Sequence, residues 1–245
     1  MNPPRDQEIN ALILQRYTVA QSALGRGLLN LHLFWIRLAW RWLTVGAQTT
    51  KRLLDILGSL ALILLFGPLM LLIVVLVKLE DGGPAFFSQT RVGKFGREFK
   101  MLKFRSMCLD AEARLKELLA QNHHSEGVTF KIKDDPRTTR VGKWLRKFSL
   151  DELPQFFNVL RGDMSLVGPR PPVPREVVMY SLADRRRLAV KPGITCFWQI
   201  GGRSEIDFSG QVALDVNYIE SQSFRVDVSV LLRTVPAVLS GKGAC

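Results

Sequence analysis

The chain has 245 residues and a formal net charge of +12, which suits one ordinary domain with an appendage rather than two full-sized domains. With 47% hydrophobic and 23% charged residues, the composition excludes a disordered or collagen-like chain. The cysteines, Cys108, Cys196 and Cys245, lie far apart and form no CxxC, which argues against a disulfide scaffold or zinc finger and favours a reducing compartment. The positive charge predicts anionic partners, namely nucleic acid, lipid headgroups or phosphorylated small molecules.

The longest apolar stretch, residues 56–77, contains no charged side chain. As a helix it would be roughly 33 Å long, about the thickness of a bilayer core. Gly67-Pro68 lies near its midpoint, and proline kinks or ends a helix because it lacks a backbone donor and clashes with the preceding turn. Two interpretations stay open from composition alone: a helix that enters one leaflet and leaves by the same face, and a kinked helix that spans the membrane.

A second apolar region, residues 24–45, precedes this stretch and combines tryptophans with arginines. Aromatic and cationic side chains among aliphatic ones are typical of a helix that lies at the headgroup boundary. The alternative, a helix packed on the protein or on a partner, stays open.

Beyond Asp81 the pattern is that of a globular domain. Residues 85–92 and 98–105 have strand-like composition around a Gly-containing turn at 93–96, which predicts a β-hairpin. Helices are predicted at 110–119, 140–148, 212–219 and 226–239. The basic helix at 140–148 could lie on anionic lipid or be a solvated helix with one packed face.

Two polar pairs in this domain receive a structural interpretation. His123-His124 cannot share one helix face and are placed in a loop, and Asp134-Asp135 before Pro136 is a turn signal rather than a metal site.

The segment 149–155, SLDELPQ, carries adjacent carboxylates. Its S-x-x-E spacing is that of a capping box, and Pro154 suits the first turn of a helix, so Asp151 and Glu152 could simply be first-turn acids. Chemically, one carboxylate could act as a nucleophile while the other binds a divalent ion. The spacing alone leaves both interpretations open.

Two further segments are candidates for phosphate and nucleotide contacts. Prolines on both sides of Arg170 restrict its backbone, which suits a guanidinium that binds phosphate oxygens, although a plain surface arginine is the alternative. Residues 191–203 are Gly-rich and aromatic, but they match neither GxGxxG nor a P-loop, so no dinucleotide or ATP fingerprint is present.

Residues 51–245 closely resemble the bacterial sugar transferases, the monotopic polyprenol-phosphate phosphoglycosyl transferases. The strings KFRSM, SLDELPQ, GPRP and KPGITCFWQIGGR occur in family order, and together they are highly specific. The resemblance implies an α+β fold: a re-entrant membrane helix at 51–80 and a cytoplasmic catalytic α/β domain with a β-hairpin at 81–245. Residues 1–50 match nothing and are predicted to be an N-terminal extension with an interfacial helix.

The resemblance also implies an activity. A hexose 1-phosphate would pass from a UDP-sugar, with UDP-glucose or UDP-galactose favoured, to undecaprenyl phosphate, releasing UMP. This would be the first membrane step of polysaccharide or glycoconjugate assembly, on the cytoplasmic face of the bacterial inner membrane. The expected partners are the UDP-sugar, undecaprenyl phosphate and membrane lipids, with no nucleic acid, and a homodimer stays open. The rival interpretation is a membrane-tethered basic nucleic-acid-binding or scaffold protein without catalysis.

The resemblance assigns roles residue by residue. Asp151 would be the nucleophile of an Asp-Glu dyad and Glu152 the ligand of a Mg²⁺ cofactor. Neighbouring cations and a helix start are expected to favour the charged form of Asp151. The other assigned residues are the phosphate-binding Arg146, Arg170 and Lys103, the nucleotide-binding Arg203 and Gln199, the functional acid Asp227, and the membrane break Gly67-Pro68.

Overall fold

The computed structural model describes residues 22–41, 46–111, 113–114, 135–202 and 206–240. Several predictions therefore lie outside the described residues: the nucleotide-binding role of Arg203, the loop at His123-His124, and most of the helix at 110–119. The chain divides into two units, Met1–Thr50 and Lys51–Cys245.

In the first unit the main described element is helix α2, Ala23–Arg41. Ser22 begins it, since its hydroxyl accepts a hydrogen bond from the amide of Gly25 at 2.9 Å. Capping of this kind satisfies a backbone donor that has no partner within the helix. The predicted helix is thus present between residues 23 and 41, and its contact with lipid stays a prediction.

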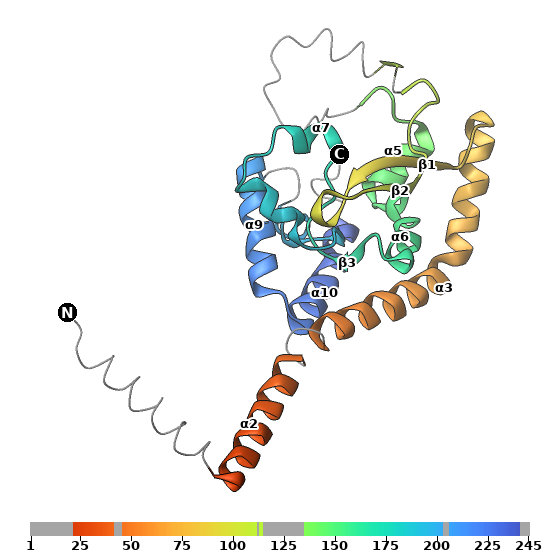
Figure 1. Ribbon diagram of the computed structural model, residues 1–245. Helices are drawn as coiled ribbons and strands as arrows, with labels where there is room; N and C mark the ends of the chain where they lie inside the picture. Colours follow the sequence, from red (N-terminus) through yellow and green to blue (C-terminus); the bar gives the residue numbers. More distant parts are fainter. Residues whose placement is uncertain (1–21, 42–45, 112, 115–134, 203–205, 241–245) are drawn as a thin grey trace. The chain divides into compact units, whose positions relative to one another are not determined.

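Helix α3, Ala47–Asp81, contains the apolar stretch and is uninterrupted, with Pro68 inside it. Among the described residues it is the one helix long and apolar enough to cross a membrane. Figure 1 shows that α3 changes direction along its length, so that its two halves follow different sides of the domain. A proline inside a helix removes one backbone hydrogen bond and favours such a bend. The re-entrant path stays a prediction.

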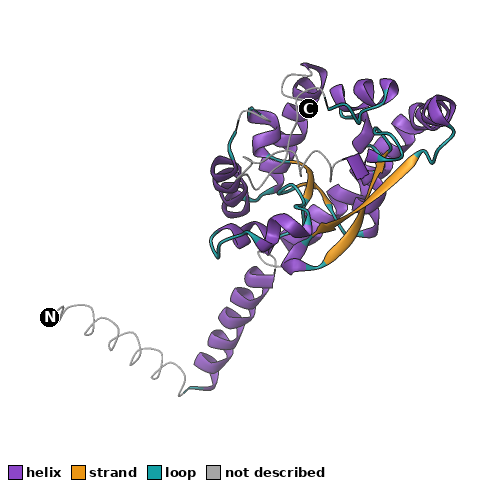
Figure 2. Cartoon of the chain, turned by 90° about the horizontal axis from the view of Figure 1, so that it is seen from above, coloured by secondary structure: helices purple, strands orange, loops and turns teal. Residues whose placement is uncertain are grey.

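The predicted hairpin is confirmed. Strands β1, Phe86–Val92, and β2, Glu98–Phe104, pair antiparallel, with Phe87 opposite Lys103. The 3-10 turn η2, Lys94–Gly96, joins them. Figure 2 shows the two strands side by side, with helices around them.

Two short strands were not predicted. β3, Ser165–Val167, pairs in parallel with β4, Gly193–Thr195, and each has three residues, too few for a visible alternation of apolar side chains. The two backbones approach closely at glycines, because a Cβ added at Gly193 would lie 2.1 Å from the amide nitrogen of Gly168. This pair holds the segment that leads into Arg170.

Helices surround these strands (Figure 1). The helices at 140–148, 212–219 and 226–239 are confirmed, the last two with longer bounds. They and their neighbours are α5 Arg140–Lys147, η3 Leu150–Glu152, α6 Gln155–Arg161, α7 Pro174–Val178, η4 Asp184–Ala189, α8 Phe197–Gly201, α9 Phe208–Ser221 and α10 Phe224–Ser240.

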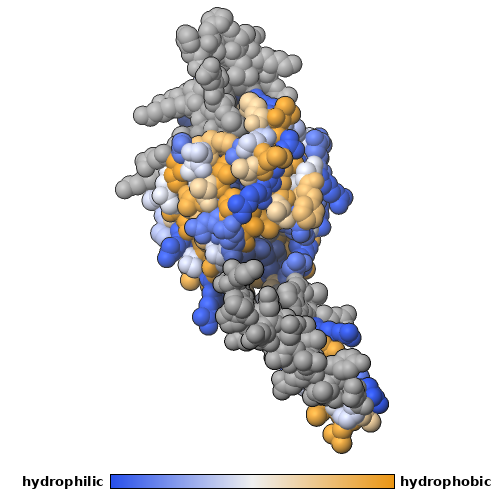
Figure 3. All heavy atoms as spheres, turned by 60° about the vertical axis from the view of Figure 1, so that its left-hand side comes forward, coloured by the Kyte–Doolittle hydropathy of each residue, from blue (hydrophilic) through white to orange (hydrophobic). Residues whose placement is uncertain are grey.

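The hydrophobic core packs the second half of α3 against the strands and helices that follow it. Ile73 and Val77 of α3 are buried with Phe104 of β2, Val159 of α6 and Val230 of α10. The core therefore ties the apolar helix to the segments on either side of the candidate site. On the face of the molecule seen in Figure 3, hydrophobic and hydrophilic residues are interspersed.

The capping-box interpretation of Ser149 is wrong. Ser149 has φ 54°, in the left-handed region, and its side chain caps nothing. The chain reverses there between α5 and the single turn η3, and α6 begins only at Gln155. Because η3 and not a longer helix carries Asp151 and Glu152, first-turn acids of a regular helix do not explain this pair.

Candidate active site

A cavity of about 1450 Å³ lies in the second unit, Lys51–Cys245. Its lining includes apolar side chains of α3, such as Leu62 and Phe66, and of α10, such as Leu231 and Val235. Asp151 and Glu152 line the same cavity. The lining thus combines carboxylates with apolar side chains from the candidate membrane helix.

Asp151 and Glu152 meet two of the predicted cations. Lys103 Nζ lies 2.7 Å from Glu152 Oε1 and 3.4 Å from Asp151 Oδ2. Arg170 Nη1 lies 3.5 Å from the same Glu152 oxygen. The hairpin therefore supplies Lys103, η3 supplies both carboxylates, and the segment after β3 supplies Arg170. Residues up to 67 positions apart in the sequence form one charged cluster.

Burial and nearby charges shift the pKa values of the two carboxylates in opposite directions. Burial is the largest influence on Asp151 and raises its pKa, although the charge of Lys103 acts in the opposite direction. Burial also tends to raise the pKa of Glu152, but the charges of Lys103 and Arg170 outweigh it and lower that pKa to about 2. The expectation that the surroundings of Asp151 favour its charged form is therefore wrong on balance, because desolvation outweighs the nearby cations.

Arg146 and Gln199 also line the cavity. Arg146 donates a hydrogen bond to Thr138 Oγ1 at 3.1 Å, and its charge lowers the pKa of Asp151. Gln199, on α8, accepts a hydrogen bond from the Cys196 thiol at 3.3 Å. Both residues are thus placed where a substrate in the cavity could contact them.

Arg91 is a further residue of the site and was not predicted from the sequence. Its guanidinium donates to the Pro171 carbonyl at 2.9 Å and lines the cavity. Burial, and next the neighbouring charge of Arg170, lower its pKa to about 10. A signal was present, since Arg91 falls on the same face of the hairpin as Lys103 by strand alternation.

Among the described residues, basic side chains outnumber acidic ones in the lining of the cavity, although Arg105 and Arg187 are paired with Asp81 and Asp215 outside it. Eight basic side chains (Arg91, Lys103, Arg105, Arg137, Arg146, Arg170, Arg175, Arg187) face four acidic ones (Asp135, Asp151, Glu152, Glu176). Such an excess attracts polyanionic ligands such as diphosphates.

Comparison with known proteins places this site in a family. The family described as bacterial sugar transferase matches residues 46–241. The chain belongs to this family. It is 51% identical over 195 residues to the galactosyl transferase CpsE of Streptococcus agalactiae serotype III, covering 79% of this chain and 43% of that protein.

Two further relatives differ in length. The exopolysaccharide production protein ExoY of Rhizobium meliloti is 43% identical over 197 residues, covering 79% of this chain and 87% of ExoY. The undecaprenyl-phosphate galactose phosphotransferase of Salmonella typhimurium is 43% identical over 202 residues, covering 81% of this chain and 42% of that protein. The chain therefore spans less than half the length of CpsE and of the Salmonella protein.

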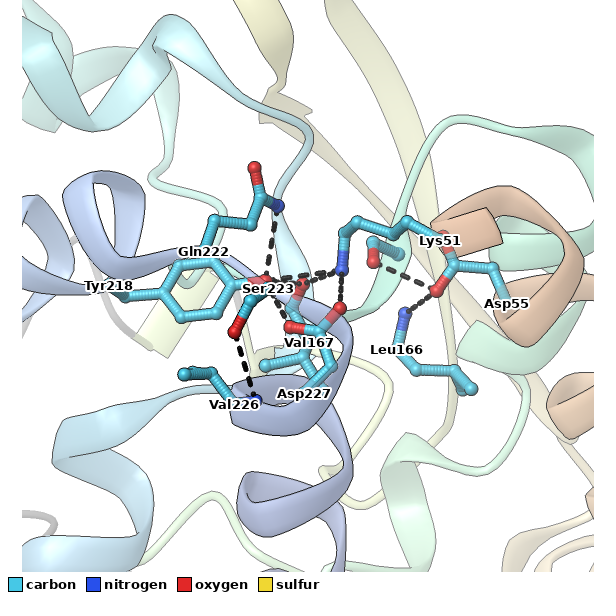
Figure 4. Close-up of polar contacts among 10 residues, drawn as sticks. Lys51, Asp55, Leu166, Val167, Tyr218, Gln222, Ser223, Val226 and Asp227 are labelled. Carbon is cyan, nitrogen blue, oxygen red and sulfur yellow. Dashed lines mark hydrogen bonds and ion pairs between the residues drawn. The ribbon is translucent and has the colours of Figure 1, made fainter. Parts of the chain in front are cut away.

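Asp227 lies apart from the charged cluster and is not among the residues that line the cavity. It is buried on α10, where Lys51 of α3 lies 2.7 Å from its Oδ2 and Tyr218 donates to its Oδ1 at 2.7 Å. Figure 4 shows this network, in which Lys51 also donates to the Val167 carbonyl at 3.0 Å. Asp227 therefore joins α10 to Lys51 of α3 and to Tyr218 of α9, and both of these side chains also donate to the Val167 carbonyl of β3.

The first turns of α3 make further contacts with the same region. Arg52 donates to the carbonyls of Val159 and Leu160 at the end of α6, at 2.6 and 2.7 Å. Asp55 accepts from Ser165 Oγ and from the Leu166 amide, both at 2.9 Å (Figure 4). α6 follows the carboxylates and β3 precedes Arg170, so α3 is bonded to both segments that carry the site.

The described residues offer few side chains that could coordinate a magnesium ion. Within the described residues no group of three or more His, Cys, Asp or Glu side chains gathers. Asp151 and Glu152 are adjacent carboxylates that line the cavity. Mg²⁺ in nucleotide sites commonly takes one or two carboxylates and completes its shell with waters and substrate phosphates. The pair therefore fits an ion that arrives with a diphosphate rather than one held by the protein alone.

Proposed function

We propose that the protein transfers a hexose 1-phosphate from UDP-galactose or UDP-glucose to undecaprenyl phosphate and releases UMP. The observation that carries the proposal is the pair of the buried Asp151 and the half-buried Glu152, in contact with Lys103 and Arg170 inside a cavity that α3 also lines. A carboxylate nucleophile, phosphate-binding cations and an apolar wall are what a reaction between a sugar nucleotide and a lipid phosphate requires. The relatives support the choice of sugar, because CpsE is named a galactosyl transferase and the Salmonella protein a galactose phosphotransferase.

The first step would form a covalent intermediate. A carboxylate oxygen of Asp151 attacks the sugar-bearing β-phosphorus, a new P–O bond forms, and the bond to the bridging oxygen breaks. UMP leaves with the bonding electrons. Arg170 and Lys103 stabilise the charge that develops on the phosphate oxygens, since fixed cations in a site of low water content act strongly on such charge.

The second step would release the sugar phosphate to the lipid. A phosphate oxygen of undecaprenyl phosphate attacks the same phosphorus, and the aspartyl P–O bond breaks, which restores the Asp151 carboxylate. The apolar side chains of α3 and α10 in the cavity wall suit the prenyl chain of this acceptor. Two steps allow two bulky anions to use one cationic site in turn.

Glu152, with Asp151 beside it, would hold Mg²⁺ together with the donor diphosphate. The ion would supply positive charge to the leaving phosphate. The low pKa of Glu152 keeps that carboxylate ionised at neutral pH, as a metal ligand must be.

The location proposed is the cytoplasmic face of the bacterial inner membrane, with α3 as a re-entrant helix. The bend of α3 and its uninterrupted helical backbone (Figure 1) are compatible with entry and exit by one leaflet. The polar contacts of Lys51, Arg52 and Asp55 attach the start of α3 to β3 and to the end of α6. Polar groups of this kind belong outside the hydrocarbon region.

The test is UMP release from a panel of UDP-sugars by the full chain, with Mg²⁺ and undecaprenyl phosphate. We expect release with UDP-galactose or UDP-glucose, and trapping of labelled sugar phosphate on the protein when the lipid is omitted. Asp151→Asn should abolish both signals, whereas Asp110→Asn, an exposed aspartate paired with Arg114, should change neither. Full activity of Asp151→Asn would overturn the nucleophile role. A nucleic-acid binder or a scaffold, the rival functions, would release no UMP at all.

A further inference from the structure

Helix α2 is a part of the chain to which the family match, beginning at residue 46, assigns no role. It ends at Arg41, and α3 begins at Ala47. Its exposed side chains divide into a polar stripe and a wide apolar arc, and such a surface suits a binding partner.

The polar side chains of α2 form one narrow stripe. Arg26, Asn30 and Arg37 are separated by four and seven positions and are all exposed. At about 100° per residue they fall within an arc of roughly 40°. Two of the three are arginines, so the stripe is cationic.

The opposite face is apolar and exposed. Leu24, Leu28, Leu31 and Trp35 have exposed fractions of 78%, 59%, 53% and 59%. Exposed apolar side chains continue around the helix through Leu38 and Phe34 on one side and Ile36 and Leu33 on the other, so that the apolar arc covers roughly 260°. His32 is the polar residue within this arc.

The width of the apolar arc distinguishes lipid from a second helix. Leu24, Leu28, Leu31 and Trp35 have the heptad spacing of a coiled coil, but a coiled-coil seam is narrow and is flanked by charged residues. Here the seam is flanked by Leu38 on one side and by His32 and then Ile36 on the other, with no charged residue beside it. A partner helix would leave these side chains in water, whereas lipid covers the whole arc.

The stripe fits the phosphate groups of lipids. Arginine stems lie along apolar surface while the guanidinium reaches the headgroups, and tryptophan prefers the same depth. The negative surface of an anionic membrane matches the cationic stripe.

We propose that α2 lies in the boundary between headgroups and acyl chains of an anionic membrane, with Arg26 and Arg37 bound to lipid phosphates. The proposal rests on the membrane location proposed above. A failure of this proposal can be distinguished from a failure of the proposed function. UMP release measures the transferase activity, and α3 would keep the chain on vesicles even if α2 does not bind lipid.

The test places a nitroxide label on each face of α2 in the full chain. Leu28→Cys or Asn30→Cys is labelled after Cys108 and Cys245 are replaced by serine; Cys196 is fully buried and can remain. In vesicles of phosphatidylcholine with phosphatidylglycerol, we expect position 28 to collide mainly with oxygen, which concentrates among acyl chains. Position 30 should collide mainly with a water-soluble nickel chelate.

Three results would overturn the proposal. Both labels exposed to the nickel chelate would place the helix in water. Both labels exposed to oxygen would place it across the hydrocarbon. Dipolar broadening between labels at position 28 would show pairing with a second copy of the chain.

The role of the arginines is tested with Arg26→Gln/Arg37→Gln carrying the label at position 28. Each arginine at an anionic surface contributes about 1 kcal/mol, so the pair should lower the lipid-to-water ratio of the label roughly 30-fold in phosphatidylglycerol vesicles. In vesicles of pure phosphatidylcholine the variant and the parent should have the same lipid-to-water ratio. Arg185→Gln/Arg186→Gln, which removes the same charge from η4, is the matched control and should behave as the parent. Equal ratios for variant and parent in phosphatidylglycerol would contradict phosphate binding.

Discussion

Lys51 Nζ lies 2.7 Å from Asp227 Oδ2, which joins the start of the apolar helix α3 to a buried carboxylate of α10. The side chain of Asp227 is only 1% exposed, so the ion pair with Lys51 and the hydrogen bond from Tyr218 replace the water that the carboxylate has lost. The same lysine donates to the Val167 carbonyl, three residues before Arg170.

The first prediction concerns this ion pair. Lys51→Met leaves the buried Asp227 carboxylate without its cation, and such a loss costs roughly 3 kcal/mol of unfolding free energy. Thermal unfolding in detergent should show a clear fall in Tm for Lys51→Met and a smaller fall for Lys51→Met/Asp227→Asn, which removes both charges. Arg114→Met, which breaks the exposed pair with Asp110, is the control and should leave Tm nearly unchanged. A double variant as unstable as Lys51→Met would argue against the pair.

The second prediction is a pH profile. Burial raises the pKa of Asp151, and a nucleophile must be ionised, so activity is present above this raised pKa and is lost as the pH falls through it. The acid limb of single-turnover UMP release should therefore lie above the ordinary aspartate value of about 3.9. Lys103→Met removes a cation that lowers the pKa and should move the limb to still higher pH. A limb at or below the ordinary value would show that desolvation does not dominate.

The third prediction concerns the shape of the Arg170 guanidinium. Arg170→Lys keeps the charge but loses the planar pair of donors that matches phosphate oxygens. Turnover should fall about 100-fold, the scale of losing one fixed donor to developing charge. Steady-state UMP release is the measurement, and Arg185→Lys on η4 is the matched control. Wild-type turnover in Arg170→Lys would show that the planar guanidinium of Arg170 is not required for the reaction.

The fourth prediction concerns the contact between β3 and β4. A Cβ at Gly193 would lie 2.1 Å from the Gly168 amide nitrogen. The nearest atoms all belong to the backbone of Gly168, so no flexible side chain can move aside to make room. Gly193→Ala should therefore lower Tm and turnover together, because it displaces the segment before Arg170. Gly27→Ala on the exposed surface of α2, where no described atom beyond its own helix and chain neighbours lies within 4 Å of the added Cβ, should lower neither Tm nor turnover. An unchanged Gly193→Ala protein would show that the two backbones can separate without cost.

Regular local patterns made much of the fold predictable. The hairpin followed from strand-like composition around a glycine turn, and α3 from an uncharged apolar run. β3 and β4 were missed because strands of three residues show no period. The role of Ser149 was misinterpreted because its spacing to Glu152 is that of a capping box, whereas its left-handed backbone turns the chain instead.

The candidate site shows the same division. The motifs pointed to Lys103, Asp151, Glu152 and Arg170, and the structure brings these four side chains together. Arg91 was missed because its contribution depends on the pairing of the hairpin, and Asp227 lies outside the cavity because Lys51 binds it elsewhere.

The sequence by itself determined the family, the apolar helix and the identity of the charged side chains, since these depend on residue order and local period. The tertiary structure alone decided which cations reach which carboxylate, and that burial raises the pKa of Asp151 while charge lowers that of Glu152. Desolvation and Coulomb energies depend on distances between segments remote in the chain, and no local pattern encodes those distances.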